Sequence, residues 1–362
     1  MFDTYSPLKK KMFQLMDHRG KIVSKKAFEA VTEETLVEGL RRILRTRTVD
    51  QRAVSYQRQG RMYTYPPNIG QEAITVAAGM VMEDHDWLVP AYRELGAWLA
   101  KGVTLQEFFL YWKGHEDGSK FSKAKNMLPV SVPIASQLLH ATGIGYALKY
   151  QKKDGVVFAF CGDGGTSQGD FHEALNFAGV WKVPVIFVVQ NNGYAISCPT
   201  AKQTAAESIA VKSVAYGIKG LQVDGNDLAA CYQAFKTARE TAQENMEPVL
   251  IEFMTYRMGA HTTSDDPGKY RTREEEAGWA DKDPVLRLRT YLSGLGKWDE
   301  KTEEQLLEQY GKEVDAAFKD VEEYTAYPLE DVFQYQYSDM PADLKAQMVD
   351  YQKFVNWKET QQ

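Results

Sequence analysis

The segment Gly155–Asn192, GVVFAFCGDGGTSQGDFHEALNFAGVWKVPVIFVVQNN, decides the fold of this 362-residue chain. Residues 155–161 and 183–189 are apolar runs rich in β-branched and aromatic side chains, which is typical of strands buried on both faces. Residues 168–182, which lie between them, carry apolar side chains at helical spacing. A strand, a helix and a second strand in this order predict two parallel strands of an α/β sheet.

Polar residues follow each of these predicted strands at the point where the strand ends. Asp163 and its flanking glycines come directly after the first strand, and Asn191-Asn192 come directly after the second. In an open parallel sheet, ligands bind at the carboxyl ends of the strands. Carboxylate and amide oxygens suit Mg²⁺, and glycines let the backbone approach phosphate groups. The pattern therefore predicts a site that holds a diphosphate through Mg²⁺.

The sequence Gly162-Asp163-Gly164-Gly165 alone would also suit a plain turn between a strand and a helix. The asparagine pair after the next strand favours the ligand site. The segment is not a dinucleotide-binding fingerprint, because the third glycine of G-x-G-x-x-G is missing. It is not a P-loop either, because no Gly-Lys-Ser/Thr follows. Neither of these nucleotide-binding motifs is therefore indicated.

The composition limits the classes of protein to which the chain can belong. Hydrophobic residues make up 44% and charged residues 25%, as in ordinary globular proteins, and the net charge of −6 argues against a nucleic-acid partner. Cys161, Cys198 and Cys231 follow no ligand spacing, which indicates a reducing compartment and no cysteine-based zinc site. No run of 18 apolar residues and no signal peptide is found. We therefore expect a soluble, cytoplasmic protein without a membrane partner.

Strands and helices alternate through the centre of the chain, so the predicted fold class is α/β with a mostly parallel sheet. The further predicted elements are helices over 32–60, from 71, over 135–149 and over 228–243, and strands within 221–227 and 248–256. Residues 258–272 lack periodicity and form a loop long enough to be functional or mobile. We expect three regions, namely an N-terminal arm over 1–30, a main domain over 31–323 and an aromatic-rich tail over 324–362.

Two further positions combine suitable chemistry with a suitable place. His261 lies beyond the last predicted strand, where a histidine can bind phosphate or transfer a proton, although a solvated loop histidine is the common alternative. The guanidinium of Arg93 can bind phosphate or form a surface salt bridge. His172-Glu173 lacks a second histidine at the i+4 position, which excludes an H-E-x-x-H zinc site. No Gly-x-Ser-x-Gly elbow is present, so serine-nucleophile chemistry is not supported.

The run from Gly162 to Gly179, together with Asn191-Asn192, resembles the thiamine-diphosphate motif in the α subunit of heterotetrameric 2-oxo acid dehydrogenase E1 components. The resemblance extends from about Arg45 to about Leu292. Further matches are Gln57–Arg61, Gly70–Ala73, Tyr92-Arg93, Pro133–Gln137, Gln190–Ser197, Gln222–Asn226 and the stretch from Tyr256 to Arg271. The resemblance implies a parallel-sheet, thiamine-diphosphate-binding α/β fold with flanking helices, an extended N-terminal arm and a helical C-terminal region.

The resemblance also implies thiamine diphosphate and Mg²⁺ as cofactors. The side chains of Asp163 and Asn192 and the carbonyl of Tyr194 would bind Mg²⁺. His261 would be the catalytic residue, reaching the diphosphate and the reaction intermediate. The other residues in contact with the cofactor would be Tyr92, Arg93, Val132, Ile134, Gly164 and Gly165, with Arg93 on the diphosphate, Ile134 holding thiamine bent and the Val132 carbonyl on the aminopyrimidine. Ser131, Pro133, Ser136 and Gln137 match a monovalent-cation site described for branched-chain members, which suggests K⁺.

The same resemblance implies that half of the active site lies on another chain. In this family the glutamate that activates the cofactor belongs to the β subunit. We therefore expect a heterotetramer of two α and two β subunits, with the cofactor at the α/β interface and no activity for this chain alone. Transfer of the acyl group to a lipoyl group implies a second partner, the E2 acyltransferase.

The implied substrate is a 2-oxo acid, and two kinds remain open. Gly162–Gln168 and Tyr65–Glu72 resemble pyruvate dehydrogenases of the Gram-positive type, which favours oxidative decarboxylation of pyruvate and acetylation of E2. Pro133–Gln137 and His261–Asp266 also resemble branched-chain 2-oxo acid dehydrogenases, which is the alternative. Thr262 stands where the regulated mitochondrial enzymes carry a serine, which indicates a bacterial protein.

Overall fold

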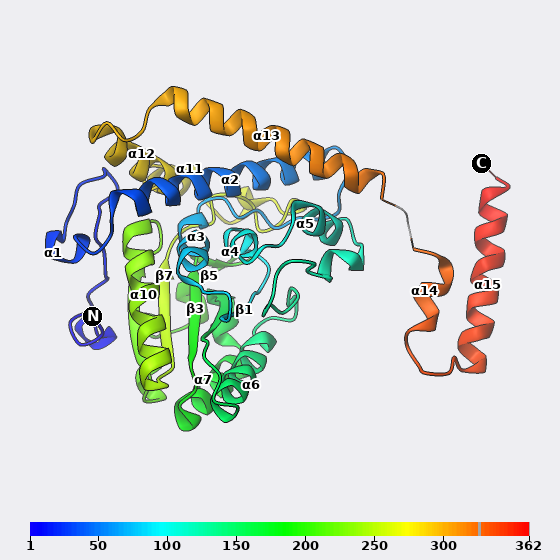
Figure 1. Ribbon diagram of the computed structural model, residues 1–362, viewed down its shortest axis with the longest axis horizontal. Coiled ribbons are helices and arrows are strands. Elements are labelled where there is room, and N and C mark those ends of the chain that lie inside the picture. The colour runs from blue at the N-terminus through cyan, green and yellow to red at the C-terminus, as the bar shows by residue number, and fades with distance from the viewer. Residues whose placement is uncertain (325–326, 362) are drawn as a thin grey trace. The chain divides into compact units, whose positions relative to one another are not determined.

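The computed structural model describes residues 1–324 and 327–361, and these form two compact units, Met1–Phe318 and Lys319–Gln362 (Figure 1). The larger unit is built on a five-stranded parallel sheet with the order β1-β2-β3-β7-β6. This confirms the predicted α/β fold class. The strands are β1 (Trp87–Val89), β2 (Val157–Gly162), β3 (Val185–Asn191), β6 (Lys219–Asp224) and β7 (Val249–Met254). A separate antiparallel ribbon consists of β4 (Tyr194–Ala195) and β5 (Cys198–Pro199).

The register of the sheet aligns the carboxyl ends of its central strands. Gly162 at the end of β2 lies opposite Gln190, and Asn191 at the end of β3 lies opposite Met254 of β7. The apolar residues of these strands are buried on both faces, as the uninterrupted apolar runs in the sequence predict. Residues that follow β2, β3 and β7 are therefore brought to one edge of the sheet.

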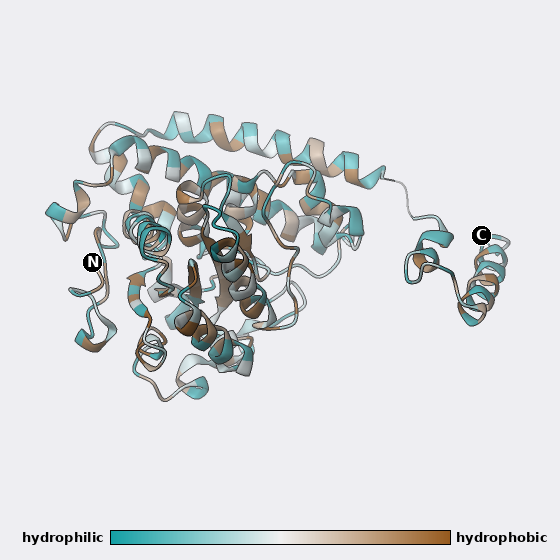
Figure 2. Ribbon diagram, turned by 60° about the horizontal axis from the view of Figure 1, so that its bottom comes forward, coloured by the Kyte–Doolittle hydropathy of each residue, from teal (hydrophilic) through white to brown (hydrophobic). Residues whose placement is uncertain are grey.

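Helices cover both faces of the sheet. On one face, α6 (Ser136–Tyr150) packs against β1, β2 and β3, and α7 (Gly169–Trp181) packs beside it. On the other face, α10 (Leu228–Asn245) packs against β3, β6 and β7, and α3 (Glu72–Val81) packs beside α10. The ring of Phe235 in α10 lies 4.8 Å from that of Phe253 and 5.9 Å from that of Phe158. The strands between these helices are brown in Figure 2, which marks them as the hydrophobic interior.

The long helix α2 (Glu33–Arg58) adds a further layer over α3, α4 (Leu95–Lys101) and α12 (Pro284–Gly294). Its N-cap is Thr32, whose hydroxyl accepts a hydrogen bond from the Thr35 amide. The helix α13 (Glu300–Glu322) runs along α2, and the rings of Tyr56 and Phe318 stack at 3.8 Å. The other helical segments of this unit are α1 (Lys25–Phe28), α5 (Leu105–Trp112), α8 (Thr200–Gln203), α9 (Lys212–Ala215), α11 (Arg273–Ala280), and the 3-10 turns η1 (Pro7–Lys9), η2 (Glu116–Ser119), η3 (Asp163–Ser167) and η4 (Pro267–Lys269).

The N-terminal segment lies along the edge strand β6 of its own chain. Phe13 forms a parallel bridge with Val223, and the amides of Leu15 and Met16 both donate to the Asp227 carboxylate at 2.7 Å. Phe13, Leu15 and Met16 are buried. Part of this polar and basic segment therefore belongs to the core of the larger unit.

The smaller unit is helical, with α14 (Leu329–Gln334) and α15 (Ala342–Glu359). Tyr351, Phe354 and Trp357 are exposed on α15, and the ring of Phe354 lies 5.9 Å from each of the other two. Within the described residues, no helix is both long and apolar enough to cross a membrane. The division into an arm over 1–30, a domain over 31–323 and a tail over 324–362 stays a prediction, and residues 325, 326 and 362 of that tail lie outside the described residues.

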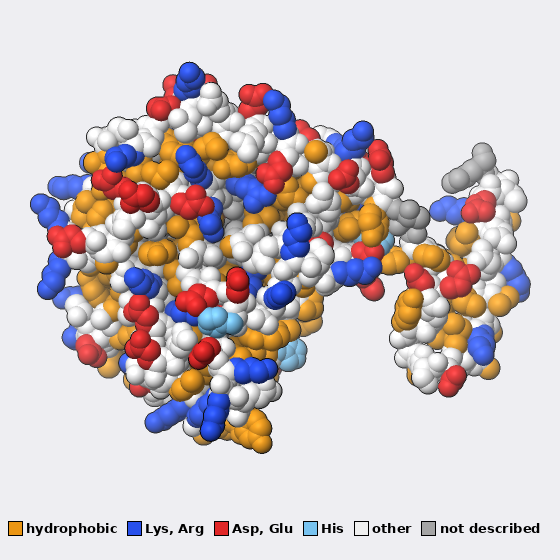
Figure 3. Space-filling view, viewed as in Figure 1, with side chains coloured by type: hydrophobic (Ala, Val, Ile, Leu, Met, Phe, Trp, Pro, Cys, Tyr) orange, Lys and Arg blue, Asp and Glu red, His pale blue; other side chains and the backbone are white. Residues whose placement is uncertain are grey.

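The charged side chains of the larger unit form no block of one sign on the face that Figure 3 shows. Basic and acidic groups are interspersed there, in keeping with the small excess of 49 acidic over 43 basic residues in the chain. The surface seen in this view therefore gives no sign of a large basic or acidic binding face.

Candidate active site

A cleft of about 230 Å³ lies at the carboxyl edge of the sheet. It is lined by residues that follow β1, β2, β3 and β7 and by the loop before α6. Among the predicted site residues, those that line it are Tyr92, Arg93, Ile134, Asp163, Gly164, Gly165, Asn192, Tyr194 and His261. Val132 lies on the same loop as Ile134 but outside the lining, and its side chain is 62% exposed. The structure thus brings together nine predicted residues from segments far apart in the sequence.

Asp163 is the acidic residue of the cleft and is only 1% exposed. Burial raises the pKa of its carboxyl group, and hydrogen bonds from Gln203 and Thr200 oppose that shift. Its Oδ2 atom accepts from Gln203 Nε2 at 2.7 Å and from Thr200 Oγ1 at 3.1 Å. Within the part of the chain that the structure describes, no lysine or arginine forms an ion pair with this carboxylate. A buried carboxylate in these surroundings favours a cation as its missing partner.

The neighbouring oxygens fit Mg²⁺ better than a softer metal. Asn192 and Tyr194 line the same cleft as Asp163, and they offer an amide and a main-chain carbonyl oxygen. The described residues contain no group of three or more His, Cys, Asp or Glu side chains that could hold a metal. One carboxylate, neutral oxygens and ligand phosphates are the ligands on which Mg²⁺ typically relies. The predicted ligand set therefore fits the ion.

The opposite side of the cleft is basic. Arg93 Nη2 lies 3.1 Å from His261 Nδ1, and Arg257 Nη1 lies 3.4 Å from the same atom. Both guanidinium groups can only donate, so Nδ1 accepts and the proton of the neutral ring is on Nε2. Burial, followed by the charges of Arg93 and Arg257, lowers the pKa of His261 to about 4. At neutral pH the side chain is therefore an uncharged donor between two cations, which suits a phosphate group.

Hydrogen bonds within the loop over 258–272 hold this basic group in place. Asp265 Oδ2 accepts from the His261 amide at 2.8 Å and from the Tyr270 hydroxyl. Arg271 donates to the carbonyls of Arg257 and Gly259. The loop carries η4 but no longer regular element, as its lack of periodicity predicts. Hydrogen bonds from its side chains therefore hold the loop in one conformation in place of a regular helix or strand.

The backbone leaves room for a ligand beside the first glycines. A side chain at Gly162 would meet no atom within 4 Å and would enter the cleft, whereas a Cβ at Gly164 would lie 2.7 Å from the Cβ of Ala195. Ile196 has a φ of 56°, which is unusual for a β-branched residue, and its carbonyl accepts from Arg257 Nη2 at 2.8 Å. Such strained residues gather at ligand sites, where surrounding contacts hold them.

The four positions that match a monovalent-cation site also come together. Ser131 Oγ lies 3.1 Å from Ser136 Oγ, and both hydroxyls lie within 3.2 Å of the Pro133 carbonyl. Gln137 Nε2 donates to the Phe160 carbonyl at 2.7 Å, while Gln137 Oε1 is buried without a hydrogen-bond partner. The oxygens of Ser131, Pro133 and Ser136 therefore lie close together, and the unpaired Gln137 Oε1 follows them at the start of α6.

Several residues that contact the predicted site residues have no role predicted from the sequence. Arg257 is 1% exposed and contacts His261, and Thr200 and Gln203 contact Asp163. Arg257 carried one signal, because a charged residue three positions after a buried strand lies at the ligand-binding edge. Thr200 and Gln203 belong to the short helix α8, and no pattern in the sequence indicates their contact with Asp163.

A parallel sheet with polar oxygens and arginines at its carboxyl edge is typical of an α/β protein that binds an anionic ligand there. Residues 40–330 match the family described as "Dehydrogenase E1 component". A protein of Staphylococcus aureus named "Pyruvate dehydrogenase E1 component subunit alpha" is 42% identical over 352 residues, 97% of this chain and 95% of that protein. A protein of the same name from Acholeplasma laidlawii is 44% identical over 341 residues, 94% of this chain and 99% of that protein. The chain belongs to the dehydrogenase E1 component family, which confirms the resemblance.

Proposed function

We propose that this chain is the α subunit of a pyruvate dehydrogenase E1 component. Together with a partner, it decarboxylates pyruvate oxidatively with thiamine diphosphate and acetylates the lipoyl group of an E2 acyltransferase. One observation carries the proposal: Asp163 and Asn192 lie in the same cleft as Arg93 and His261, so the cleft offers metal ligands and phosphate ligands together. The relatives of nearly full length are named for pyruvate dehydrogenase, so the branched-chain alternative is not favoured.

The residues of this chain bind and orient the cofactor. Asp163, Asn192 and the Tyr194 carbonyl would hold Mg²⁺, and Arg93 and its neighbour Arg257 would bind the diphosphate. When bound, thiamine diphosphate supplies the electron sink for decarboxylation of a 2-oxo acid. The Nε2 proton of His261, whose Nδ1 is engaged by the two arginines, would be available to the diphosphate or to a reacting oxygen. Val132 and Ile134 would contact the organic part of the cofactor, Gly164 and Gly165 would let the backbone approach its phosphates, and Tyr92 would also contact it.

A second chain completes the site. Asp163 is the acidic residue among the described residues that line the cleft, and it would be taken up by the metal. In this family the glutamate that activates the cofactor belongs to the β subunit, which would lie over the opening. Val132 and Ile134 are 62% and 46% exposed there, and a partner would cover them. The assembly is a heterotetramer of two α and two β subunits in the bacterial cytoplasm.

A second exposed apolar surface supports this assembly. It consists of Tyr146, Tyr150, Phe177, Val180 and Trp181 and is called here the α6–α7 aromatic face. The ring of Trp181 lies 5.0 Å from that of Tyr146 and 4.8 Å from that of Phe177, so the aromatic side chains form one patch. A side chain at the neighbouring Gly143 would meet nothing within 4 Å, which leaves room for a helix to approach. Contiguous aromatic patches of this kind mark protein interfaces.

This face is assigned to the β subunit, and a charge placed on it tests the assignment. Val180→Asp should prevent co-purification of the two subunits, whereas Val180→Thr, which keeps the size without the charge, should allow it. Size-exclusion chromatography with light scattering measures the assembly. An intact heterotetramer from Val180→Asp would contradict the assignment.

The loop over Ser131–Gln137 is proposed to bind K⁺. The gathered oxygens of Ser131, Pro133 and Ser136 and the unpaired Gln137 Oε1 support this. K⁺ should raise the thermal unfolding temperature of the assembly more than the same concentration of Na⁺, and Gln137→Met should remove the difference. Equal effects of both ions on the unmutated assembly would contradict a selective site.

The substrate proposal is tested in the reconstituted α/β pair with its E2 partner. We expect turnover of pyruvate to exceed turnover of 3-methyl-2-oxobutanoate at equal concentrations, and neither subunit to be active alone. Preference for the branched substrate would replace the proposed function by the branched-chain alternative. Activity of this chain alone would overturn the claim that the site is shared.

A further inference from the structure

The segment over 65–72, between α2 and α3, contacts both sides of the cleft from behind. The Pro67 carbonyl accepts from Arg93 Nε at 3.1 Å. Gln71 Oε1 accepts from Asn192 Nδ2 at 3.1 Å. Gln71 is 1% exposed and is not among the residues that line the cleft. One short segment therefore contacts both Arg93, the proposed diphosphate-binding residue, and Asn192, the proposed metal ligand. Its own residues Pro67 and Gln71 do not line the cleft.

Two contacts, one with the Tyr194 amide and one with Gln71, together orient the Asn192 amide. An asparagine amide has an oxygen that can bind a cation and an NH₂ group that cannot. The Tyr194 amide can only donate, and it lies 3.3 Å from Asn192 Oδ1. The Asn192 NH₂ group must then point to Gln71, which presents its oxygen. Because Gln71 binds the NH₂ end of the Asn192 amide, Asn192 Oδ1 points away from Gln71 and is available to a metal ion.

The NH₂ end of the Gln71 amide destabilises the fold. Its Nε2 atom is buried and has no hydrogen-bond partner among the described residues. A buried donor without a partner costs about 1 to 3 kcal/mol. A methionine of similar length would avoid that cost but would leave the buried Asn192 NH₂ group without its acceptor. A requirement for the Gln71 oxygen at Asn192 explains a glutamine at this position.

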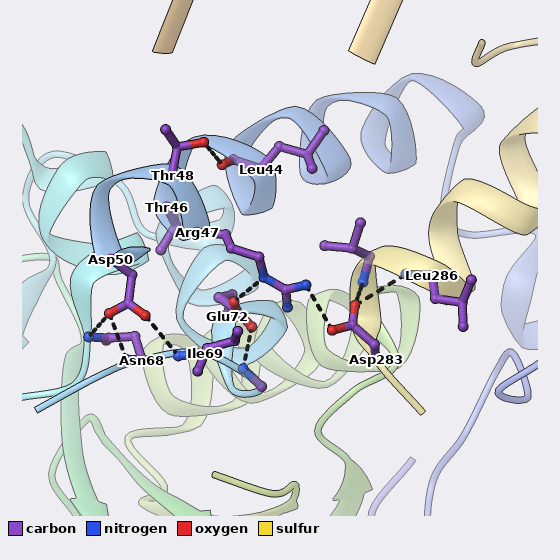
Figure 4. Close-up of polar contacts among 12 residues, drawn as sticks. Leu44, Thr46, Arg47, Thr48, Asp50, Asn68, Ile69, Glu72, Asp283 and Leu286 are labelled. Atoms are coloured by element: carbon purple, nitrogen blue, oxygen red, sulfur yellow. Dashed lines mark hydrogen bonds and ion pairs between the residues drawn. The ribbon is translucent and has the colours of Figure 1, made fainter. Parts of the chain in front are cut away.

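Two charged residues of α2 hold the segment in place, as Figure 4 shows. Asp50 points at the segment, and its carboxylate accepts from the amides of Asn68 at 2.7 Å and Ile69 at 3.2 Å. Arg47 Nε lies 2.6 Å from Glu72 Oε1, and Glu72 Oε2 accepts from the Gly70 amide at 2.9 Å. These contacts lie on both sides of Gln71 in the sequence. The backbone that carries Gln71 is therefore fixed to a 26-residue helix.

The turn before Gln71 requires a glycine. Gly70 has a φ of 98°, and a Cβ there would lie 2.3 Å from the Tyr256 carbonyl oxygen. The Met258 amide donates to the Ile69 carbonyl at 3.1 Å, and the Thr255 hydroxyl donates to the Gly70 carbonyl at 2.9 Å. The segment is thus also tied to the chain that leads from β7 to Arg257.

We propose that Gln71 is a positioning residue for the metal ligand, which acts by orienting the Asn192 amide so that its oxygen faces Mg²⁺. The inference rests on the proposed function, because it takes Asn192 as a ligand of that ion. Gln71 touches neither the ion nor the cofactor and acts through Asn192 alone. Residues that orient a metal ligand in this way typically contribute roughly 10- to 100-fold to metal affinity.

Three variants in the full-length α chain, assembled with its β subunit and stripped of cofactor, test the proposal. Gln71→Met removes the acceptor, and Gln71→Glu keeps an acceptor. Gln233→Met makes the first change at another glutamine, in α10, which also has one unpaired amide atom, in its case Oε1. Calorimetry of thiamine diphosphate at a series of Mg²⁺ concentrations gives the Mg²⁺ needed for half-maximal binding. Thermal unfolding of the stripped assembly gives its stability.

We expect Gln71→Met to need roughly 10- to 100-fold more Mg²⁺. Its unfolding temperature should stay close to that of the unmutated assembly, because the unpaired Gln71 donor is removed while the Asn192 NH₂ group loses its acceptor. Gln71→Glu should stay within about threefold of the unmutated assembly, and Gln233→Met should not change the Mg²⁺ requirement. Normal Mg²⁺ dependence of Gln71→Met, or an equal loss in Gln71→Glu, would overturn the positioning role. A loss that follows a lowered unfolding temperature would also overturn it, as a structural role. Absence of Mg²⁺-dependent binding in the unmutated assembly would instead overturn the proposed function, and this inference with it.

Discussion

The cleft has two sides that differ in how the chain builds them. The metal side, Asp163, Asn192 and Tyr194, follows two adjacent strands joined by a single helix. The basic side, Arg93, Arg257 and His261, follows β1 and β7, which are far apart in the sequence. The sheet order β1-β2-β3-β7 places the strands of the metal side in the middle and those of the basic side outside them. The segments after β1 and β7 contact each other where Arg93 lies beside His261.

The comparison shows why neither side is sufficient alone. The proposed metal side holds a buried carboxylate with no ion-pair partner among the described residues, and the basic side holds two guanidinium groups beside a neutral histidine. A metal–diphosphate complex satisfies both, because the ion carries the positive charge and the phosphates carry the negative charge. Variants on the two sides should therefore fail differently, and the expected effects are ordered here from the largest to the smallest.

Asp163→Ala should abolish Mg²⁺-dependent binding of thiamine diphosphate, because it removes the carboxylate of the metal side. Calorimetry with the α/β assembly measures the affinity, and Asp163→Asn, which keeps the size, should lose most of the Mg²⁺ dependence as well. The weak binding that remains without Mg²⁺ should not change, because the basic side is intact. Unchanged affinity of Asp163→Ala in Mg²⁺ would remove Asp163 from the metal site.

His261→Ala should keep cofactor binding but lose acetylation of E2 by roughly 100-fold or more, because a positioned proton donor typically contributes that much. Transfer of acetyl groups to an isolated lipoyl domain is the measurement, with cofactor affinity as the control. This change separates catalysis from binding on the basic side. Full acetylation would make His261 a bystander.

Arg257→Met should weaken thiamine diphosphate binding by roughly 10- to 100-fold, as expected for the loss of one charged hydrogen bond of about 1.5 to 3 kcal/mol. In contrast to Asp163→Ala, it should also weaken binding in the absence of Mg²⁺. Calorimetry with Mg²⁺ and with EDTA distinguishes the two variants. Loss confined to the Mg²⁺ condition would place Arg257 on the metal side, through its contact with the Tyr194 carbonyl.

Binding of the cofactor should be accompanied by uptake of a fraction of a proton near pH 5.5. Burial and the two arginines lower the pKa of His261 from 6.5 to about 4 in the free protein, so the ring is neutral at this pH. Phosphate charge favours the protonated ring and raises that pKa, so a proton is taken up and binding strengthens as pH falls from about 6.5 toward 4. Calorimetry in buffers of different ionisation enthalpy measures the uptake, with His261→Gln as the control. Equal uptake in both proteins would assign it to other groups.

The stability of the free protein should show the opposite dependence on pH through the same histidine. Its pKa is lower in the folded than in the unfolded state, so the unfolded chain binds more protons between about pH 4 and 6.5. The contribution of His261 to stability therefore rises with pH through this window. Denaturant unfolding should show a weaker rise for His261→Gln than for the unmutated protein, and an equal rise would contradict the lowered pKa.

The two sides also differ in how far the sequence alone predicts them. Asp163 and Asn192 follow apolar runs that identify buried strands, so their place at the sheet edge follows from local pattern. The strand β1, only three residues long, has no such pattern, and the position of Arg93 beside His261 depends on a contact across 168 residues. The role of Gln71 depends on the direction of one amide, which only neighbouring donors decide. Local sequence patterns therefore could not predict the long-range contacts or the orientation of side-chain amides.

Titration of thiamine diphosphate into the α/β assembly, once with Mg²⁺ and once with EDTA, tests the central claim that one cleft uses both sides. We predict saturation at one cofactor per α chain with Mg²⁺ and affinity lower by roughly 10- to 100-fold with EDTA, since the charged contacts of the metal side, about 1.5 to 3 kcal/mol, are lost while those of the basic side remain. Equal affinity in both conditions, or no binding with Mg²⁺, would contradict the account.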